Sequence, residues 1–281
     1  MLVKDKGDIM NSKKLKLSGV LFVLAIIIYV VNVLGILLTV ILNSFSKGWF
    51  SGALPPMYTL EWYKYAITDH AIGSLLQVTF IVVIVVVGVS LLIAYPAAYV
   101  MARHNFPFKA LVMTLFLLPM LIPPMTYGVP LATALYKVRL AGKISGVILA
   151  NLVPIVPFMI LILTPFIEQI GSNLESAARM LGANKVTIFF RILAPLTLPG
   201  ILTAGILSVV KTISMFELTF LVAGGKSQTI VVALFADAFA AGARPWQAID
   251  ALAVIYFSIT MICLVIALKF VNPTQMVFKV K

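Results

Sequence analysis

Long apolar runs, separated by short polar stretches, dominate the chain. Six of these runs are long enough to cross a bilayer as helices, which takes about 20 residues. They cover residues 17–42, 74–101, 110–135, 146–166, 196–222 and 251–271. The pattern predicts an all-α membrane protein with six transmembrane helices. Residues 17–271 would form one transmembrane domain, between an N-terminal segment, 1–16, and a C-terminal tail, 272–281.

Two of the six runs contain several prolines. Proline removes a backbone donor and interrupts a helix, so the freed carbonyl groups need neighbouring protein or a water-lined cavity. We therefore expect bent helices that pack around a central pathway. The prolines concerned are Pro119, Pro123, Pro124 and Pro130 in the third run, and Pro154, Pro157 and Pro165 in the fourth.

Composition agrees with a membrane protein and excludes a soluble domain, because 62% of the residues are hydrophobic and only 11% are charged. The net charge of +12 does not indicate a nucleic-acid-binding protein, because the basic residues lie between apolar runs and form no stripe. Cys263 is the only cysteine, which excludes a disulfide framework and a cysteine-based metal site. The first apolar run is too long for a cleaved signal peptide, and we expect it to be retained.

The distribution of basic residues predicts the orientation. If the N-terminus is cytoplasmic, 13 lysines and arginines fall on the cytoplasmic side and 7 on the other side. Lysine and arginine accumulate in cytoplasmic loops, so both termini are expected inside. The longest polar interruption in the second half of the chain, residues 168–195, would then lie in the cytoplasm.

Residues 168–195 predict a helix, a glycine and a second helix. Residues 174–181 can form two turns, with Ser172 or Asn173 as the N-cap and Glu175 near the positive end. Gly182 follows the last apolar residue, where a left-handed cap favours glycine. An amphipathic run, 185–193, comes next, and Pro195 is expected to stop it.

This stretch resembles the cytoplasmic loop of the permease subunits of ATP-binding-cassette (ABC) importers. That family has a Glu-Ala-Ala pattern, a glycine four residues later and an Ile-x-Leu-Pro ending. The residues that match in type and spacing are Ala177, Ala178, Gly182, Ile192 and Pro195. The motif glutamate is replaced by Ser176, with Glu175 one residue earlier, and the leucine before the proline is replaced by Ala194.

The resemblance implies that this loop docks into a separate ATP-hydrolysing subunit. The docking residues would be Glu175, Ser176, Ala177, Ala178, Gly182, Arg191 and Pro195. It further implies a permease of the bacterial inner membrane that works with ATPase subunits, a second permease and an external substrate-binding protein. The alternative is an ordinary connector between two spans.

This chain itself is not expected to be an enzyme or to bind a cofactor, because ATP and Mg²⁺ would be held by the ATPase. The sequence Gly225-Lys226-Ser227 matches the end of a phosphate-binding loop, but Phe220 stands where the first glycine is required. Histidine pairs and aspartate pairs are absent from the predicted spans, which argues against a membrane protease.

The first outer loop, 43–70, is rich in aromatic residues. They can form an interfacial belt or a cation-holding surface at the mouth of a transporter. The pattern Gly48-Trp49-Phe50, Pro55-Pro56 and Thr59-Leu60-x-Trp62-Tyr63 resembles the second permease of polyamine-type importers. Importers of iron, thiamine, aminophosphonates and opines share much of this pattern.

Charged residues within spans are costly, so they are candidates for a substrate pathway. Lys211 and Glu217 are six residues apart, which is about 120° around a helix, so they are not expected to pair. The segment around Glu217 and Thr219 resembles the place where polyamine-type permeases keep acidic residues. Glu217 is thus a candidate contact for a cation, or simply an interfacial carboxylate. Asp237 is a further candidate, in an outer segment that would line the exit.

The function expected from the sequence is therefore that of an importer permease, with a polyamine such as spermidine or putrescine as the first choice of substrate. An aminophosphonate, an opine, thiamine or iron is the alternative substrate. The alternative of another class is a secondary transporter or channel that works without ATP. Such a protein would need a relay of intramembrane acidic or histidine residues.

Overall fold

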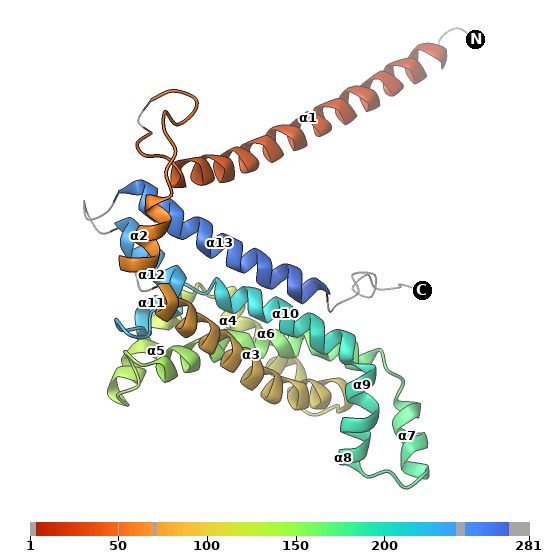
Figure 1. Cartoon of the computed structure of the whole chain (residues 1–281). Coiled ribbons are helices and arrows are strands. Elements are labelled where there is room, and N and C mark those ends of the chain that lie inside the picture. The colour runs from red at the N-terminus through yellow and green to blue at the C-terminus, as the bar shows by residue number, and fades with distance from the viewer. Residues whose placement is uncertain (1–3, 50, 70–71, 240–244, 270–281) are drawn as a thin grey trace. The chain divides into compact units, whose positions relative to one another are not determined.

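We analysed a computed structural model of the chain, which describes residues 4–49, 51–69, 72–239 and 245–269. Helices make up nearly all of its regular structure (Figure 1). Within these ranges the one strand-like feature is an antiparallel bridge between Ser46 and Tyr58. The prediction of an all-helical protein is therefore confirmed for the described part of the chain.

The chain divides into two compact units. The first comprises residues Met1–Tyr65 and Arg244–Val254, and the second Ala66–Ala243 and Ile255–Lys281. In the first unit, α1 (Lys4–Ser44) leads into an aromatic loop and the start of α2 (Glu61–Asp69), and the first turns of α13 (Trp246–Lys269) belong to the same unit. The side-chain amide of Asn43 donates a hydrogen bond to Asp250, in the second turn of α13.

Several aromatic side chains of the first outer loop are used inside the loop itself. The indole N–H of Trp62 donates to the carbonyl of Ser46 at 2.6 Å, and that of Trp49 donates to the carbonyl of Gly52 at 3.0 Å. The Tyr63 hydroxyl lies 2.7 Å from the Ser44 hydroxyl, and partial burial raises the pKa of Tyr63. These three aromatic side chains therefore stabilise the loop.

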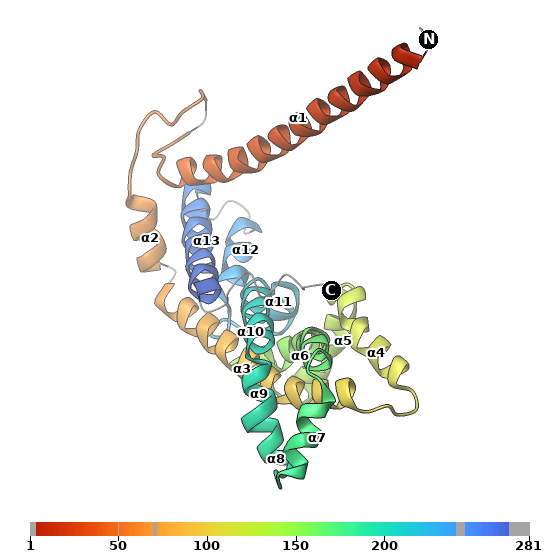
Figure 2. The ribbon, with the colours of Figure 1, turned by 90° about the vertical axis from the view of Figure 1, so that its right-hand side faces the viewer.

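The second unit is a helical bundle built on three helices, α3 (Ile72–Arg103), α6 (Ile144–Glu168) and α10 (Leu198–Ile213). Their facing residues include side chains with almost no exposed surface. They include Val82 and Val86 on α3, and Ile155, Met159, Leu163 and Ile167 on α6. Figure 2 shows α4 (Lys109–Leu121) and α5 (Pro124–Lys137) joined at a sharp corner beside this bundle.

Within the described residues, four helices are long and apolar enough to cross a membrane, and the number reaches six if each of two bent helix pairs counts as one span. The helices cover residues 19–44, 72–103, 144–168 and 246–266, near four of the predicted runs. One bent pair is α4 with α5, which meet at 96°. Ile122 and Pro123 separate them, so the predicted break in the third run is confirmed.

The fourth run was expected to be broken by its prolines, and that expectation is wrong. Helix α6 is continuous from Ile144 to Glu168 with Pro154, Pro157 and Pro165 inside it. Pro154 is buried against neighbouring helices. Packing of α3 and α10 against α6 holds the helical path although the prolines remove backbone donors.

The fifth run is also not one continuous span. Helix α10 ends at Ile213, Ser214 and Met215 turn the chain, and α11 begins at Glu217 and ends at Val222. The hydroxyl of Ser214 donates to the carbonyls of Val210 and Lys211, which satisfies acceptors at the end of α10. Helix α12 (Ile230–Phe239) follows. The sixth run begins earlier than expected, at Trp246, and its last residues, 270–271, lie outside the described residues.

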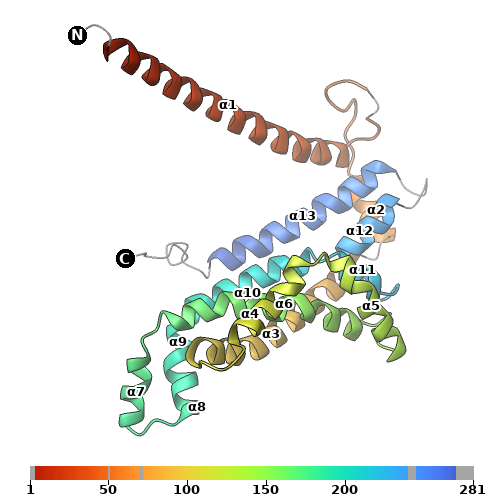
Figure 3. The same ribbon diagram turned by 180° about the vertical axis from the view of Figure 1, so that it is seen from behind.

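The loop singled out in the sequence forms one end of the second unit. Helix α7 (Ser172–Met180) and helix α8 (Lys185–Thr187) lie side by side, beyond the ends of α3, α6 and α10 (Figures 1 and 3). A π-helical segment, Ile188–Leu193, and α9 (Ala194–Leu196) connect α8 back to α10. This second bent pair, residues 185–196 and 198–213, has an angle of 71°.

Candidate functional site

The end of α7 is closed by Gly182. Its φ is +85°, and its N–H donates to the carbonyl of Arg179 at 2.9 Å. The N–H of Ala183 donates to the carbonyl of Ala178 at 3.0 Å. This pair of bonds is the Schellman arrangement that ends many helices, and it favours glycine because a left-handed residue strains any side chain. The predicted role of Gly182 as a helix cap is confirmed.

The predicted N-cap of α7 is wrong. Gly171 occupies the N-cap position, and it has no side chain that could form a cap, while Ser172 is the first helical residue. The next short helix does have a side-chain cap, since Asn184 accepts a hydrogen bond from the N–H of Thr187 at 2.7 Å. The turn between α7 and α8 is therefore fixed from both sides.

Pro195 does not stop the second helical run, as the sequence analysis expected. It lies in the first turn of α9, where a helix needs no donor from that residue, and the helical path continues to Leu196. The bend follows at Thr197, which has a ψ of 4°. Thr197 is buried, and its hydroxyl donates to the carbonyl of Leu193 at 2.8 Å.

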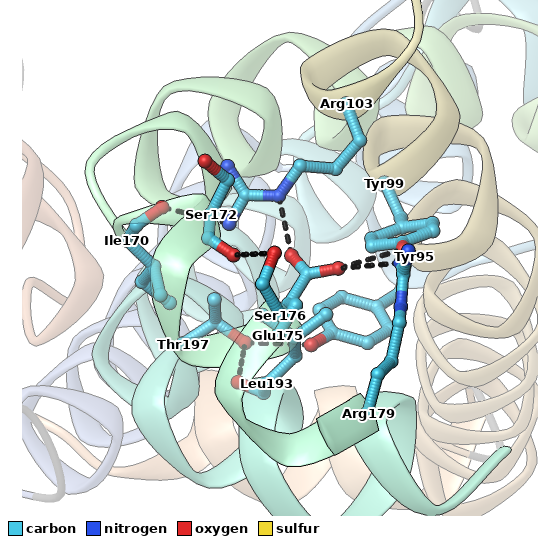
Figure 4. A network of polar contacts seen from close by, with 10 residues as sticks. All are labelled: Tyr95, Tyr99, Arg103, Ile170, Ser172, Glu175, Ser176, Arg179, Leu193 and Thr197. Carbon is cyan, nitrogen blue, oxygen red and sulfur yellow. Dashed lines mark hydrogen bonds and ion pairs between the residues drawn. The ribbon is translucent and has the colours of Figure 1, made fainter. Parts of the chain in front are cut away.

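Glu175 is the polar centre of the loop (Figure 4). Although it is ionisable, only 4% of its surface is exposed. Its Oε1 accepts a hydrogen bond from Arg103 Nε at 2.6 Å, and its Oε2 accepts one from the Tyr99 hydroxyl at 3.0 Å. Arg179 Nη2 lies 3.7 Å from Oε2. The carboxylate is thus satisfied by the end of α3 and by its own helix.

Arg103 holds the loop at two points. Besides Glu175, its Nη2 donates to the carbonyl of Ile170 at 2.7 Å, in the turn that follows α6. The guanidinium therefore joins three segments, the ends of α3 and α6 and the helix α7. A buried pair with extra hydrogen bonds fixes geometry, and removal of one partner strands the other charge.

A second contact joins α3 to the helices after the turn. The Tyr95 hydroxyl lies 2.8 Å from the Thr197 hydroxyl, at the bend between α9 and α10. The Phe189 ring contacts the edges of Tyr95 and Tyr99, with centroid distances of 4.9 Å and 5.7 Å. Displacement of the loop therefore displaces α3 and α10 together.

The predicted docking residues divide into two groups. Glu175 and Ala178 are buried inside the unit, so they support the loop from within. Ser176, Ala177, Gly182, Arg191 and Pro195 are exposed. Ser176, which replaces the motif glutamate, lies on the outer side of α7 and donates only to the carbonyl of Ser172, at 3.3 Å.

The most exposed side chains of the loop are not among the predicted docking residues. Met180 and Leu181, at the tip, are 89% and 90% exposed, and Leu174, Val186 and Phe190 are more than half exposed. Exposed apolar side chains in such number are unusual on a free surface and are typical of a protein contact. Its signal in the sequence is the Met-Leu pair immediately before Gly182.

The predicted pathway residues are distributed over three helices. Glu217 begins α11, and Thr219 on the same helix is buried and accepts a hydrogen bond from Asn151 Nδ2 at 3.1 Å. Lys211 lies near the end of α10 with its Nζ 4.4 Å above the centre of the Phe158 ring. Asp237 lies on α12.

Some buried polar atoms near Glu217 have no hydrogen-bond partner within the described ranges. They include the side-chain oxygen of Asn151 and the hydroxyl of Tyr127 on α5. Orphan polar atoms are rare in native interiors, so this part of the bundle has hydrogen-bonding capacity that its own side chains do not use.

Four phenylalanine rings form an array next to Glu217, which the sequence analysis also missed. Phe216 stacks on Phe220 at 5.2 Å and contacts Phe235 at 4.3 Å, and Phe235 contacts Phe239 at 4.3 Å. Phe220 and Phe239 are 43% and 73% exposed. Phe216, the N-cap residue of α11, is four residues before Phe220, and Phe235 is four residues before Phe239 on α12, which is the spacing of side chains on one helix face.

The loop at 224–227, which partly matches a phosphate-binding motif, has a structural role. The Ser227 hydroxyl accepts a hydrogen bond from the N–H of Gly224 at 2.8 Å and lies 3.0 Å from the carbonyl of Gly142. It therefore locks the turn after α11 to the turn before α6. No cluster of His, Cys, Asp or Glu suited to a metal ion occurs among the described residues.

Comparison with known proteins agrees with this architecture. The family model described as "Binding-protein-dependent transport system inner membrane component" matches residues 94–276, more than half of the chain. The matched segment contains the loop, α10, α11 and α12.

Relatives with different names match the chain. The sulfoquinovosyl glycerol transport system permease SmoH of Agrobacterium fabrum is 32% identical over 170 residues, which are 60% of this chain and 58% of SmoH. The sulfate transport system permease CysW of Synechocystis is 26% identical, over 78% of this chain and 81% of CysW. The spermidine/putrescine transport system permease PotB of Haemophilus influenzae is 32% identical, over 49% of this chain and 54% of PotB.

A solved structure supports the fold. One chain of a bacterial ABC transporter that imports the acidic polysaccharide alginate superposes with a TM-score of 0.73 at 17% identity, covering 92% of this chain and 97% of that chain. The family match, the likeness in fold and the capped loop agree. The chain thus belongs to the family of inner-membrane components of binding-protein-dependent transport systems.

Proposed function

We propose that this chain is one of two permease subunits of an ABC importer and that its loop, residues 168–195, couples a separate ATPase to the transport pathway. The observation that carries the proposal is the pairing of an exposed apolar tip with a buried ionic support. Met180 and Leu181 are free for contact. Glu175 behind them is bound to Arg103 at the end of α3.

This arrangement is suited to the transmission of force. An ATPase that moves the tip displaces α7, and the Glu175–Arg103 pair transfers that displacement to α3. The Tyr95–Thr197 contact transfers it to the bend before α10. Because α3, α6 and α10 pack as one core, they move as rigid elements, which is how packed interfaces switch between two states.

The assembly we propose has two permeases around a shared pathway, two ATPases on the cytoplasmic side and a substrate-binding protein outside. Both termini and the loop would be cytoplasmic, as the distribution of basic residues predicts.

A test of this orientation is to replace Cys263 by Ala, then to place single cysteines at Ser176 and at Gly225. An impermeant thiol reagent added to intact cells should label the Gly225 site and not the Ser176 site, and the reverse would contradict this orientation.

For the substrate, the first proposal remains a polyamine-like organic cation. Glu217 beside the phenylalanine array supports it, because a carboxylate attracts ammonium groups while ring faces favour cations and methylene chains. The similarity to PotB, whose name includes spermidine and putrescine, gives further support. Uptake of a labelled polyamine by cells that carry the complete importer, with Glu217→Gln and Glu217→Asp as variants, tests it. Loss in the first and retention in the second are expected.

The second proposal is a small oxyanion, and Lys211 supports it. Lys211 is an intramembrane cation that contacts the Phe158 ring, and it has no ion pair with a carboxylate among the described residues. The names of CysW and SmoH refer to sulfate and to sulfoquinovosyl glycerol. If this proposal is correct, Lys211→Gln abolishes uptake of the anion, while Glu217→Gln leaves it intact. The two variants thus separate the two substrate classes.

A further inference from the structure

A pocket of about 340 Å³ lies between the end of α3 and the helical segments of the loop itself. Its lining residues come from α3, the turn after it, α7, α8 and the π-helical segment. They are Tyr99, His104, Arg179, Lys185, Val186, Phe189 and Phe190. The proposed docking of the ATPase uses the tip, Met180 and Leu181, and leaves this pocket on the flank without a role.

The chemistry of the pocket is cationic and aromatic. Arg179 and Lys185 are exposed, and none of the lining residues is acidic. Arg179 Nη2 lies 3.7 Å from the Glu175 carboxylate, which has a closer partner in Arg103 Nε at 2.6 Å. The pocket therefore has spare positive charge, and an anion of compact size complements it.

The depth of the pocket along α3 indicates which anion is available. Helix α3 has 32 residues, so it is about 48 Å long, whereas the hydrocarbon core is about 30 Å thick and the bilayer with headgroups is about 40–45 Å thick. When the apolar centre of α3 is placed in the middle of the bilayer, Tyr99 falls in the headgroup layer. His104, just past the end of α3, falls at its outer edge.

The apolar part of the lining suits the same level of the membrane. Val186 and Phe190 are 64% and 65% exposed at the side of the pocket, and Phe189 closes its inner wall against Tyr99 at 5.7 Å. Aromatic rings with a basic residue beside them are the usual composition of the membrane interface. A phosphate group would meet Arg179 and Lys185, while the glycerol and upper acyl chain would lie along Val186 and Phe190.

We propose that this pocket binds the headgroup of an anionic phospholipid. The lipid would rest against the loop that couples ATPase to pathway, so its headgroup would stabilise α7 and α8 in their observed arrangement. The inference rests on the membrane span of α3 and on the lining residues, and it stands whatever substrate the importer carries.

The test uses the full chain purified in mild detergent, with phosphatidylglycerol and phosphatidylcholine of identical acyl chains as probes. Native mass spectrometry measures the lipid retained. We expect preferential retention of phosphatidylglycerol, and a loss on the order of twenty-fold in Arg179→Gln/Lys185→Gln, since a basic residue near the surface contributes about five-fold. The matched control, Lys137→Gln/Lys143→Gln, removes the same charge from an exposed turn elsewhere and should change retention less than two-fold.

Three outcomes would overturn the proposal. Equal retention by the Arg179/Lys185 variant and the wild type would mean that the pocket holds no lipid. Displacement of the lipid by inorganic phosphate at the same concentration would show a site for a free anion. Displacement by the purified partner ATPase, with no lipid left in the assembled complex, would assign the pocket to a protein interface. A second variant, Lys185→Gln alone, should reduce the retention of phosphatidylglycerol about five-fold. It separates loss of lipid binding from a folding defect in the double variant.

Discussion

The two ends of the second unit differ in how far their buried polar groups are hydrogen-bonded. At the loop end, every oxygen of the buried Glu175 carboxylate has a partner from the protein, and Arg103 joins three segments. At the α11 end, the Asn151 side-chain oxygen and the Tyr127 hydroxyl are buried without a partner among the described residues. The first region is built to stay assembled while it moves, and the second keeps hydrogen-bonding capacity for another molecule.

The same contrast holds for apolar groups. The exposed side chains at the loop, Met180 and Leu181, project from a turn that glycine and asparagine caps make rigid. The exposed phenylalanines near Glu217 pack on one another along two helices. A projecting apolar tip suits a groove on another protein, whereas a flat aromatic array beside a carboxylate suits a ligand that passes over it.

The largest effect is expected from Arg103→Ala. It strands the buried Glu175 carboxylate and frees the carbonyl of Ile170, and removal of one partner of such a pair costs about 3–5 kcal/mol. Uptake should fall strongly while the chain still reaches the membrane, because the loop loses its fixed support on α3 and α6. Arg103→Ala combined with Glu175→Gln should recover part of the thermal stability in detergent. If the single variant transports normally, the pair is not the support of the loop.

The next effect is expected at Gly182. Gly182→Ala forces a side chain into the left-handed region and should destabilise the loop by about 1 kcal/mol, because φ is +85° there. Gly171→Ala is the matched control, since a Cβ at either glycine meets nothing within 4 Å and only Gly182 has a positive φ. Hydrogen exchange of the α7 amides should rise about five-fold in the first variant and stay unchanged in the second. Equal hydrogen exchange of the α7 amides in the two variants would contradict the role of Gly182 as the cap of α7.

Two tyrosine variants sharpen the comparison between the two ends. Tyr95→Phe removes the contact with Thr197 and should cost about 1 kcal/mol, while Tyr127→Phe removes a hydroxyl without a partner in the described structure and should be neutral or slightly stabilising. Thermal melts in detergent measure both. Should Tyr127→Phe also reduce uptake without loss of stability, the hydroxyl contacts substrate. A loss of stability in Tyr127→Phe comparable to that in Tyr95→Phe would contradict the contrast.

The smallest effect is expected from Ser176→Glu, which restores the glutamate of the family pattern. Ser176 is exposed and makes one weak bond, so the free energy of unfolding should change by no more than about 0.5 kcal/mol. If the exposed face of α7 contacts the ATPase, coupling of ATP hydrolysis to transport will change although stability does not. ATPase activity of the reconstituted complex, with and without binding protein, is the measurement. A change in stability larger than this would mean that Ser176 has contacts that the structure lacks.

Much of the fold follows from the sequence because membrane helices are determined by apolar length. The predicted runs fall on helices or bent pairs, and the break between α4 and α5 follows from the adjacent Pro123 and Pro124. The same rule fails where packing overrides it, as in α6, which stays continuous with three prolines. It also fails at Ser214 and Met215, where no proline or glycine marks the end of α10.

The site was predictable only where its chemistry is local. Gly182 was identified because a helix cap depends on adjacent residues alone. The role of Glu175 was not, because its partner Arg103 lies 72 residues earlier and only the packing of α3 against the loop brings them together. The Asn151–Thr219 bond, over 68 residues, escaped prediction for the same reason. Local pattern predicts elements and caps, whereas pairing between elements requires the fold.

The most direct test of the central claim is purification of the tagged chain from its native membrane in mild detergent, with partners identified by mass spectrometry. The wild type should recover an ATPase and a second permease. Met180→Glu/Leu181→Glu, altered only at the exposed tip, should recover the second permease without the ATPase. Recovery of the ATPase in equal amount with both chains, or with neither under conditions that keep a known importer intact, would contradict the claim that this loop docks an ATPase.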